Sequence, residues 1–161
     1  FRMGDPAEPL PRLVATESGY HTSQNGTGVV AGVQQGISPR AQGIYFPRHF
    51  LTGFDLNVDR TFTYEFLDER ADGNDPENRF GIVDHEMRPK PAYLALSSLL
   101  KGLATSGPER MVSVSHDGPP DLRVVALSTG PKAVTVFLWR ALTSYDREAR
   151  RDALHDSVSV R

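Results

Sequence analysis

The sequence predicts an α/β fold in which two strand–loop–helix units of a parallel sheet precede part of an antiparallel β-sandwich. Short apolar or β-branched runs alternate with helical runs up to about residue 105, which is typical of a parallel sheet. Only strand-like runs and turns follow. The turn-forming segment Ser106-Gly107-Pro108 lies between the two textures. We therefore expect one unit over residues 1–105 and a partial sandwich over residues 106–161.

The two strands of the first unit are predicted from different patterns. Residues 13–16 form a short apolar run between proline-rich coil and Ser18-Gly19, as in a buried parallel strand. A long loop, rich in glycine and small polar residues, is expected over residues 18–35. Residues 61–66 alternate β-branched and aromatic side chains with period two, which predicts the second strand. Two strands cannot close a parallel sheet, so we expect the rest of it outside this chain.

The helices are predicted from their start signals. Ser38-Pro39 combines an N-cap residue with a proline at the first helical position. Pro47 lies inside this helix and should kink or restart it, because it lacks an amide donor. Gly53 or Asn57 should end it. A second helix should begin at Pro91 and carry an apolar stripe. The residues of that stripe are Tyr93 or Leu94, Leu96, Leu99, Leu100 and Leu103.

The second unit contains four predicted strands and two short turns. The strands are residues 111–115, 122–128, 133–140 and 156–160, and the turns are residues 117–120 and 129–131. A short extended segment is also expected at residues 80–83, in the first unit.

Composition excludes several classes of protein. The chain has 161 residues, a net charge of -2 and no basic stripe, so we expect no nucleic-acid partner. No apolar run approaches the roughly 20 residues of a membrane span. The absence of cysteine excludes disulfides and thiolate metal sites, and the five histidines have no metal-ligand spacing. The start has neither an initiator Met nor an apolar signal core, so we expect the chain to be cut from a longer protein.

Glu17 is the residue with the clearest chemical potential. It follows the first strand and opens a glycine-containing loop, and barrel enzymes place their catalytic residues at the carboxyl ends of parallel strands. The alternative is an exposed glutamate that merely begins a loop. Tyr20 and His21 follow in the same loop and are either functional or simply packed there.

Four segments together resemble a known group of enzymes, the clan A retaining glycoside hydrolases, which are (β/α)8 TIM barrels and include the cellulase-like families. Val14-Ala15-Thr16-Glu17-Ser18-Gly19-Tyr20-His21-Thr22 is similar to their seventh-strand segment, and Tyr64-Glu65 stands where the eighth strand should lie. Phe80-Gly81-Ile82-Val83-Asp84 and Pro89-Lys90-Pro91-Ala92-Tyr93 resemble the ending of the barrel. The resemblance covers roughly residues 13–103 and implies about strands 7–8 and helices 7–8, with an accessory β-sandwich behind them.

The resemblance implies a hydrolase of β-glycosidic bonds with Glu17 as the nucleophile of a double displacement. The acid/base glutamate would follow the fourth strand, in an N-terminal barrel portion missing here, so this chain alone should be inactive. No cofactor is implied, and the partner would be a carbohydrate, a β-glycoside or β-glucan. An extracellular location is expected from the resemblance only.

The resemblance also implies candidate substrate contacts. Tyr20, His21, Tyr64 and Asp68 could reach the sugar. For Asp68 the alternative is an ion pair with an arginine, namely Arg60, Arg70 or Arg79. The tryptophan that commonly follows the eighth strand is absent, which leaves the substrate class open.

Two other interpretations remain. The protein could bind carbohydrate or act as a surface protein on a degenerate glycosidase scaffold, without catalysis. The sandwich could instead serve only to cover and stabilise the barrel. Trp139, which alternates with Phe137 in a β-run, fits a core or interdomain position better than a sugar platform.

Overall fold

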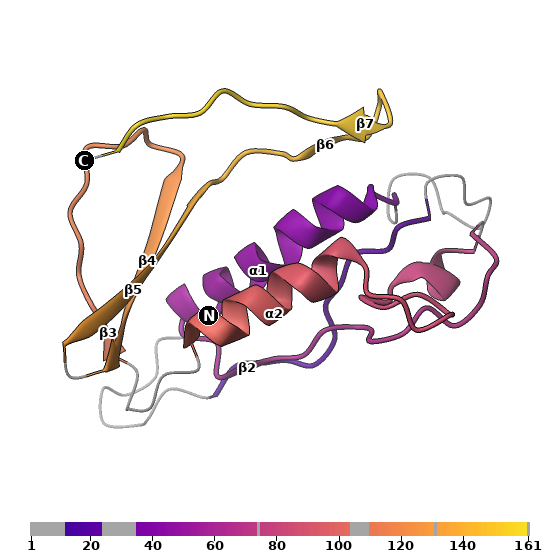
Figure 1. Ribbon diagram of the computed structural model, residues 1–161, viewed down its shortest axis with the longest axis horizontal. Helices are drawn as coiled ribbons and strands as arrows, with labels where there is room; N and C mark the ends of the chain where they lie inside the picture. Colours follow the sequence, from indigo (N-terminus) through magenta and orange to yellow (C-terminus); the bar gives the residue numbers. More distant parts are fainter. Residues whose placement is uncertain (1–11, 24–34, 74, 104–109, 131, 161) are drawn as a thin grey trace, which may run out of the picture.

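The computed structural model describes residues 12–23, 35–73, 75–103, 110–130 and 132–160 as a mixed α/β fold with small sheets (Figure 1). Two long helices lie side by side, with a parallel strand pair on one side and an antiparallel sheet on the other. The elements are β1 Val14–Ala15, α1 Pro39–Asp55, β2 Arg60–Thr61, the 3-10 helix η1 Pro76–Arg79, α2 Pro91–Leu103, β3 Arg110–Met111, β4 Leu122–Gly130, β5 Ala133–Arg140, β6 Tyr145–Asp146 and β7 Arg151–Asp152.

The predicted parallel pairing is confirmed, but both strands are much shorter than predicted. Val14 pairs with Arg60 and Ala15 with Thr61, so the regular ladder of β1 and β2 ends where strands over residues 13–16 and 61–66 should have continued. The two segments stay linked by single backbone hydrogen bonds beyond the ladder. Propensity favoured a continuous second strand, but the chain bends at Tyr64 and Phe66, and a strand also needs a regular partner along its length.

Helix α1 begins where the sequence predicts. The Ser38 hydroxyl accepts a hydrogen bond from the Ala41 amide at 3.0 Å, and Pro39 is the first helical residue. The helix ends just before Asn57, whose positive φ of 60° is the left-handed conformation that terminates helices. Asn57, and not Gly53, is therefore the stop signal.

The predicted restart at Pro47 is wrong. Helix α1 continues through Pro47 without a break. Phe46 and Leu51, on either side of the proline, are 0% and 7% exposed, and their burial stabilises the helix on both sides of Pro47. Tertiary packing thus outweighs the lost backbone hydrogen bond of the proline.

Helices α1 and α2 approach each other closely at Gly43. A Cβ placed on Gly43 would lie 3.0 Å from both the carbonyl carbon and Cβ of Pro91, which begins α2 as predicted. Phe46 and Ala92 form a core cluster with Ile82 and Val83 beside this contact. The glycine therefore permits the tight helix pair that supports the rest of the fold.

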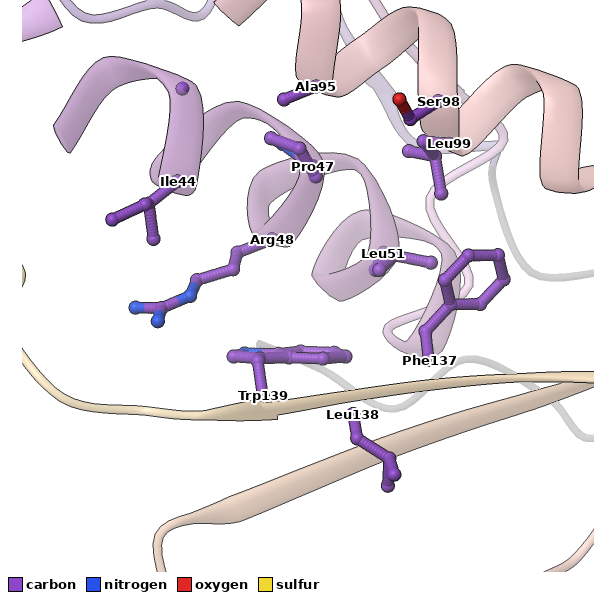
Figure 2. A pocket seen from close by; sticks show the side chains of 11 residues that line it. Ile44, Pro47, Arg48, Leu51, Ala95, Ser98, Leu99, Phe137, Leu138 and Trp139 are labelled. Atoms are coloured by element: carbon purple, nitrogen blue, oxygen red, sulfur yellow. The ribbon is translucent and has the colours of Figure 1, made fainter. Parts of the chain in front are cut away.

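The antiparallel sheet has the order β3-β4-β5 and packs one face on the helix pair. In Figure 2, Phe137 and Trp139 of β5 point toward the helices, and Leu138 points away. Leu51 and Leu99 of the helices form one core cluster with residues of β4, and Trp139 packs against it. A cavity of about 380 Å³ remains at this junction. Trp139 thus lies between the two predicted units, as a core residue would.

The other predicted strands are confirmed only in part. The β4 and β5 predictions are confirmed, apart from the end of β4. The strand predicted over residues 111–115 is reduced to Arg110–Met111, and residues 156–160 form no strand. Alternation predicted the last one, but a strand requires a hydrogen-bonded neighbour. The ribbon of β6 and β7 was not predicted. The boundary predicted at residues 105 and 106 lies outside the described residues.

Among the described helices, none has the length and apolarity needed to cross a membrane.

The turn after Ile82-Val83 is held by one carboxylate, Asp84. Partial burial alone would raise its pKa, but hydrogen bonds from the Arg88 amide, the Arg88 guanidinium and the Glu86 amide outweigh burial and lower the pKa of Asp84 to about 2. The bonds are 2.9, 2.7 and 2.9 Å long, respectively. Such a carboxylate stabilises the fold while it is ionised.

Asp84 should therefore add a pH-dependent contribution to stability. Its folded pKa of about 2 lies below the ordinary 3.8, so the contribution is complete above pH 3.8 and is lost as the pH falls toward 2. Urea unfolding between pH 2 and 5 should show Asp84→Asn less stable than the parent sequence at pH 5, with the difference shrinking toward pH 2. A difference that stays constant over this range would contradict the assignment.

Candidate functional site

Glu17 lies at the carboxyl end of β1, where the parallel pair opens toward its loops. Its side chain is exposed. The neighbouring strand end carries Thr63 and Tyr64. This is the position that the sequence analysis predicted for a catalytic carboxylate.

The backbone register shifts by one residue at Glu17. The Phe62 amide donates to the Ala15 carbonyl at 2.9 Å. The next bond of a regular ladder would join the Tyr64 amide to the Glu17 carbonyl, two residues further on each strand. The Tyr64 amide instead donates to Ser18, also at 2.9 Å. One extra residue is thus accommodated on the first strand, which is the kind of irregularity that re-aims side chains near functional sites.

Gly19 allows the two strand ends to touch. A Cβ on Gly19 would lie 1.9 Å from the Tyr64 carbonyl oxygen, far inside van der Waals contact. The glycine beside the predicted catalytic residue is therefore required by close backbone approach. It brings the segment of Glu17 against the segment of Tyr64.

Tyr64 lies within the electrostatic field of four carboxylates. The negative charge of Glu65 is the main cause that raises the pKa of the Tyr64 hydroxyl, followed by burial and by Glu77, Glu69 and Glu17. The Tyr64 amide bonds to the residue after Glu17, and the charge of Glu17 is the smallest of these effects on the Tyr64 hydroxyl. A raised pKa keeps the phenol protonated, so that it can donate a hydrogen bond.

Glu65 was not among the predicted site residues, but the structure surrounds its carboxyl group with other carboxylates. Burial raises its pKa, and so do the carboxylates Glu69, Asp68 and Glu77, whereas Lys90 opposes them. Glu69 and Asp68 are near in the sequence, but burial, Glu77 and Lys90 act only in the folded chain, so the sequence predicts the shift only in part.

Tyr20 and His21 are packed beneath the loop. The Tyr20 ring meets Tyr45, Phe46 and His49 at centroid distances of 5.3, 5.6 and 6.2 Å, and burial is the main cause that raises the pKa of its hydroxyl. His21 is 4% exposed. These two side chains therefore hold the loop of Glu17 in place, and neither is brought to the exposed strand ends.

Asp68 is buried in an ionic network. It is 1% exposed, and its carboxylate accepts hydrogen bonds from Lys90 at 3.0 and 3.3 Å and from Arg79 at 3.3 Å. The pairing with Arg79 is the alternative that the sequence left open. Lys90 also donates to the Thr22 hydroxyl at 3.2 Å, and the Thr22 amide donates to the Arg79 carbonyl at 3.0 Å.

This network joins three segments at the strand ends. It connects the loop after β1, the loop after β2 and the start of α2. Burial lowers the pKa of Lys90, although the Asp68 carboxylate opposes the effect. Neither loop can move far without separating buried charges.

A further contact was not predicted at all. Ser18, the residue after Glu17, lies 2.8 Å from the Nε2 atom of His49 on α1, and its hydroxyl donates to the Phe62 carbonyl at 2.8 Å. Burial lowers the pKa of His49. In the sequence, His49 is one of several dispersed histidines, and no spacing links it to Ser18.

Within the part of the chain that the structure describes, no group of three or more His, Cys, Asp or Glu side chains is placed to hold a metal ion. The arrangement offers an exposed carboxylate, a protonated phenol and a loop braced from below. Such groups can attack an electrophilic carbon or hydrogen-bond a polar ligand.

Comparison with known proteins finds a likeness to solved structures. No family model matches the chain, and no curated protein matches its sequence. Among solved structures, it is similar to a family 39 glycoside hydrolase from the gut symbiont Bacteroides cellulosilyticus WH2, with a TM-score of 0.57 and 20% identity. The match covers 81% of this chain and 24% of that chain. The chain thus spans about a quarter of that protein, and at this identity the likeness shows the fold alone.

Proposed function

We propose that this chain is the carboxyl-terminal part of a retaining β-glycosidase, in which Glu17 is the nucleophile. The observation that carries the proposal is the position of Glu17, exposed at the carboxyl end of β1 beside its parallel partner β2. Both strands are followed by helices that pack together, as in the outer layer of a TIM barrel. The likeness to a glycoside hydrolase supports the same class.

In this proposal, β1 and β2 are the seventh and eighth strands of the barrel, and the sheet of β3, β4 and β5 belongs to an accessory sandwich. The apolar side chains left exposed on the strand pair support a missing barrel portion, because six further strand–helix units would cover them. Leu13, Val14 and Phe62 are 61%, 40% and 52% exposed.

The chemistry follows from the carboxylate. A Glu17 oxygen would attack the anomeric carbon while an acid, supplied outside this chain, protonates the departing oxygen. The two carboxyl groups of a retaining enzyme stand about 5–5.5 Å apart. Water would then release the sugar with its original configuration. No cofactor takes part.

Among the predicted substrate contacts, the accessible one is Tyr64. Its hydroxyl, whose pKa is raised mainly by the charge of Glu65, stays protonated and suits a hydrogen bond to a sugar hydroxyl. His21 and Asp68 are buried and would support the site from beneath, and Tyr20 would support the loop by packing.

Activity of the full-length parent protein tests the proposal. Glu17→Gln should lower kcat on aryl β-glycosides by on the order of 10³-fold or more, because the amide cannot form the glycosyl–enzyme bond. The neighbouring exposed residue Thr16 offers a matched control, and Thr16→Val should retain most of the activity.

Equal activity of the Glu17→Gln variant and the parent would remove Glu17 from the chemistry. Carbohydrate binding to β-glucans without hydrolysis by either protein would favour the alternative, a binding protein on a degenerate glycosidase scaffold.

A further inference from the structure

The contact between helix α1 and the residue after Glu17 has a defined hydrogen-bond direction. Ser18 has one hydroxyl proton, and it donates this proton to the Phe62 carbonyl, which cannot donate in return. The short distance of 2.8 Å between Ser18 Oγ and His49 Nε2 therefore requires His49 to be the donor. The ring must carry its proton on Nε2 to make this bond.

The His49 ring is itself held by its neighbours. It packs edge-on against Tyr20 at a centroid distance of 6.2 Å and against Phe50 at 6.0 Å. Burial lowers the pKa of His49, which favours the neutral ring. A ring fixed by two aromatic contacts is a rigid donor.

Ser18 makes three hydrogen bonds to two separate parts of the fold, the segment after β2 and helix α1. Its carbonyl accepts from the Tyr64 amide at 2.9 Å, its hydroxyl donates to Phe62, and the same hydroxyl accepts from His49. Glu17 immediately precedes it, at the point where the register shifts. The direction in which the exposed Glu17 side chain leaves the strand depends on how firmly Ser18 is held.

We propose that His49 is a positioning residue for Glu17, which acts by donating from Nε2 to Ser18 Oγ. This inference rests on the proposed function of Glu17. A residue of helix α1, outside the loops at the strand ends, would thus help to set the position of the nucleophile. A displacement of a reacting group by about 1 Å can cost about 100-fold in rate.

Covalent trapping measures the positioned step directly. In the full-length protein without substitutions, here called the parent, a 2,4-dinitrophenyl 2-deoxy-2-fluoro-β-D-glycoside would react with Glu17. The glucoside and the xyloside would both be tested. The carboxylate oxygen forms a bond to the anomeric carbon. The bond from that carbon to the dinitrophenyl oxygen breaks, and dinitrophenolate leaves with the electron pair. No proton is needed, so the acid outside this chain does not affect the rate. Peptide mass spectrometry identifies the labelled residue.

The variants separate positioning from packing. His49→Leu removes the donor and should slow trapping about 10- to 100-fold. His49→Gln places an amide donor near the same point and should restore the rate to within about threefold. Ser18→Ala should slow trapping like His49→Leu. His155→Leu, a substitution at an exposed histidine bonded to the Thr143 carbonyl, is the matched control and should react like the parent.

The outcomes distinguish the role of His49 from the role of Glu17. Label on Glu17, with slow His49→Leu and restored His49→Gln, supports positioning. Label on Glu17, with His49→Leu as fast as the parent, overturns it and leaves the proposed function intact. Equal slowing by Leu and Gln, with a matching fall in Tm, indicates packing alone and also overturns it. Label on another residue, or none, refutes the proposed nucleophile and the inference together.

Discussion

Asp68→Ala is expected to lower the free energy of unfolding by about 3–5 kcal/mol, because it leaves the buried Lys90 ammonium without its carboxylate partner. Asp68 is 1% and Lys90 is 8% exposed, so water cannot replace the lost partner without opening the structure. Arg79 would lose the same partner. Chemical denaturation measures the change.

A more exposed pair provides the control. Asp121 binds Arg140 through two hydrogen bonds of 2.6 and 3.0 Å, but the two side chains are 25% and 29% exposed. Asp121→Ala should therefore destabilise much less. Equal effects of the two substitutions would show that burial of Asp68 does not set the cost.

The double variant Asp68→Leu with Lys90→Met tests the physical cause. It replaces two buried charges by apolar side chains. The loss in free energy of unfolding should be smaller than the sum of the losses for Asp68→Leu and Lys90→Met alone. A double variant as unstable as that sum would mean that the charges do not interact.

Gly81→Ala should be similarly severe, with a loss on the order of 3 kcal/mol or more, because it forces backbone apart. The added Cβ would lie 2.1 Å from the Asp68 nitrogen, 2.5 Å from the Leu67 carbonyl carbon and 2.6 Å from the Val83 carbonyl oxygen. The Asp68 amide donates to that same carbonyl at 2.9 Å. No side chain can turn aside to relieve the contact.

Gly102→Ala offers the comparison on the same chain. Gly102 lies in α2, and the atoms nearest to its Cβ position are those of the Phe137 ring at 3.9 Å, which is ordinary contact. Alanine in a helix should stabilise by roughly 0.5–1 kcal/mol. A loss of stability for Gly102→Ala, or none for Gly81→Ala, would contradict the steric argument.

Local signals explain what could be predicted from the sequence. Ser38-Pro39 and Pro91 mark the helix starts correctly because caps and first-turn prolines act within a few residues. The paired runs of β4 and β5 were predicted because an alternating pattern and a turn suffice for a hairpin. The place of Glu17 at a strand end followed from the apolar run before it.

The rest depends on contacts between distant residues. Propensity contains no information on the register shift at Glu17, which is set by Gly19 against Tyr64. The bond between Ser18 and His49 joins residues 31 positions apart. The burial of Asp68 could not be predicted either. Its partner Lys90 lies 22 positions away, and nothing in the sequence around Lys90 indicates which residue it binds.

The bonds that hold the Glu17 loop also set the order in which the molecule can fold. Ser18 bonds to Phe62 across 44 positions, and Thr22 bonds to Lys90 across 68. Helices and the β4–β5 hairpin form from near neighbours within microseconds, whereas contacts at such separations must first overcome loop-closure entropy. Helix α1 lies inside both loops, and α2 begins directly after Lys90, so the pairing of the two helices shortens the distance that remains to be closed. We therefore expect the strand ends around Glu17 to assemble last, on helices that have already paired.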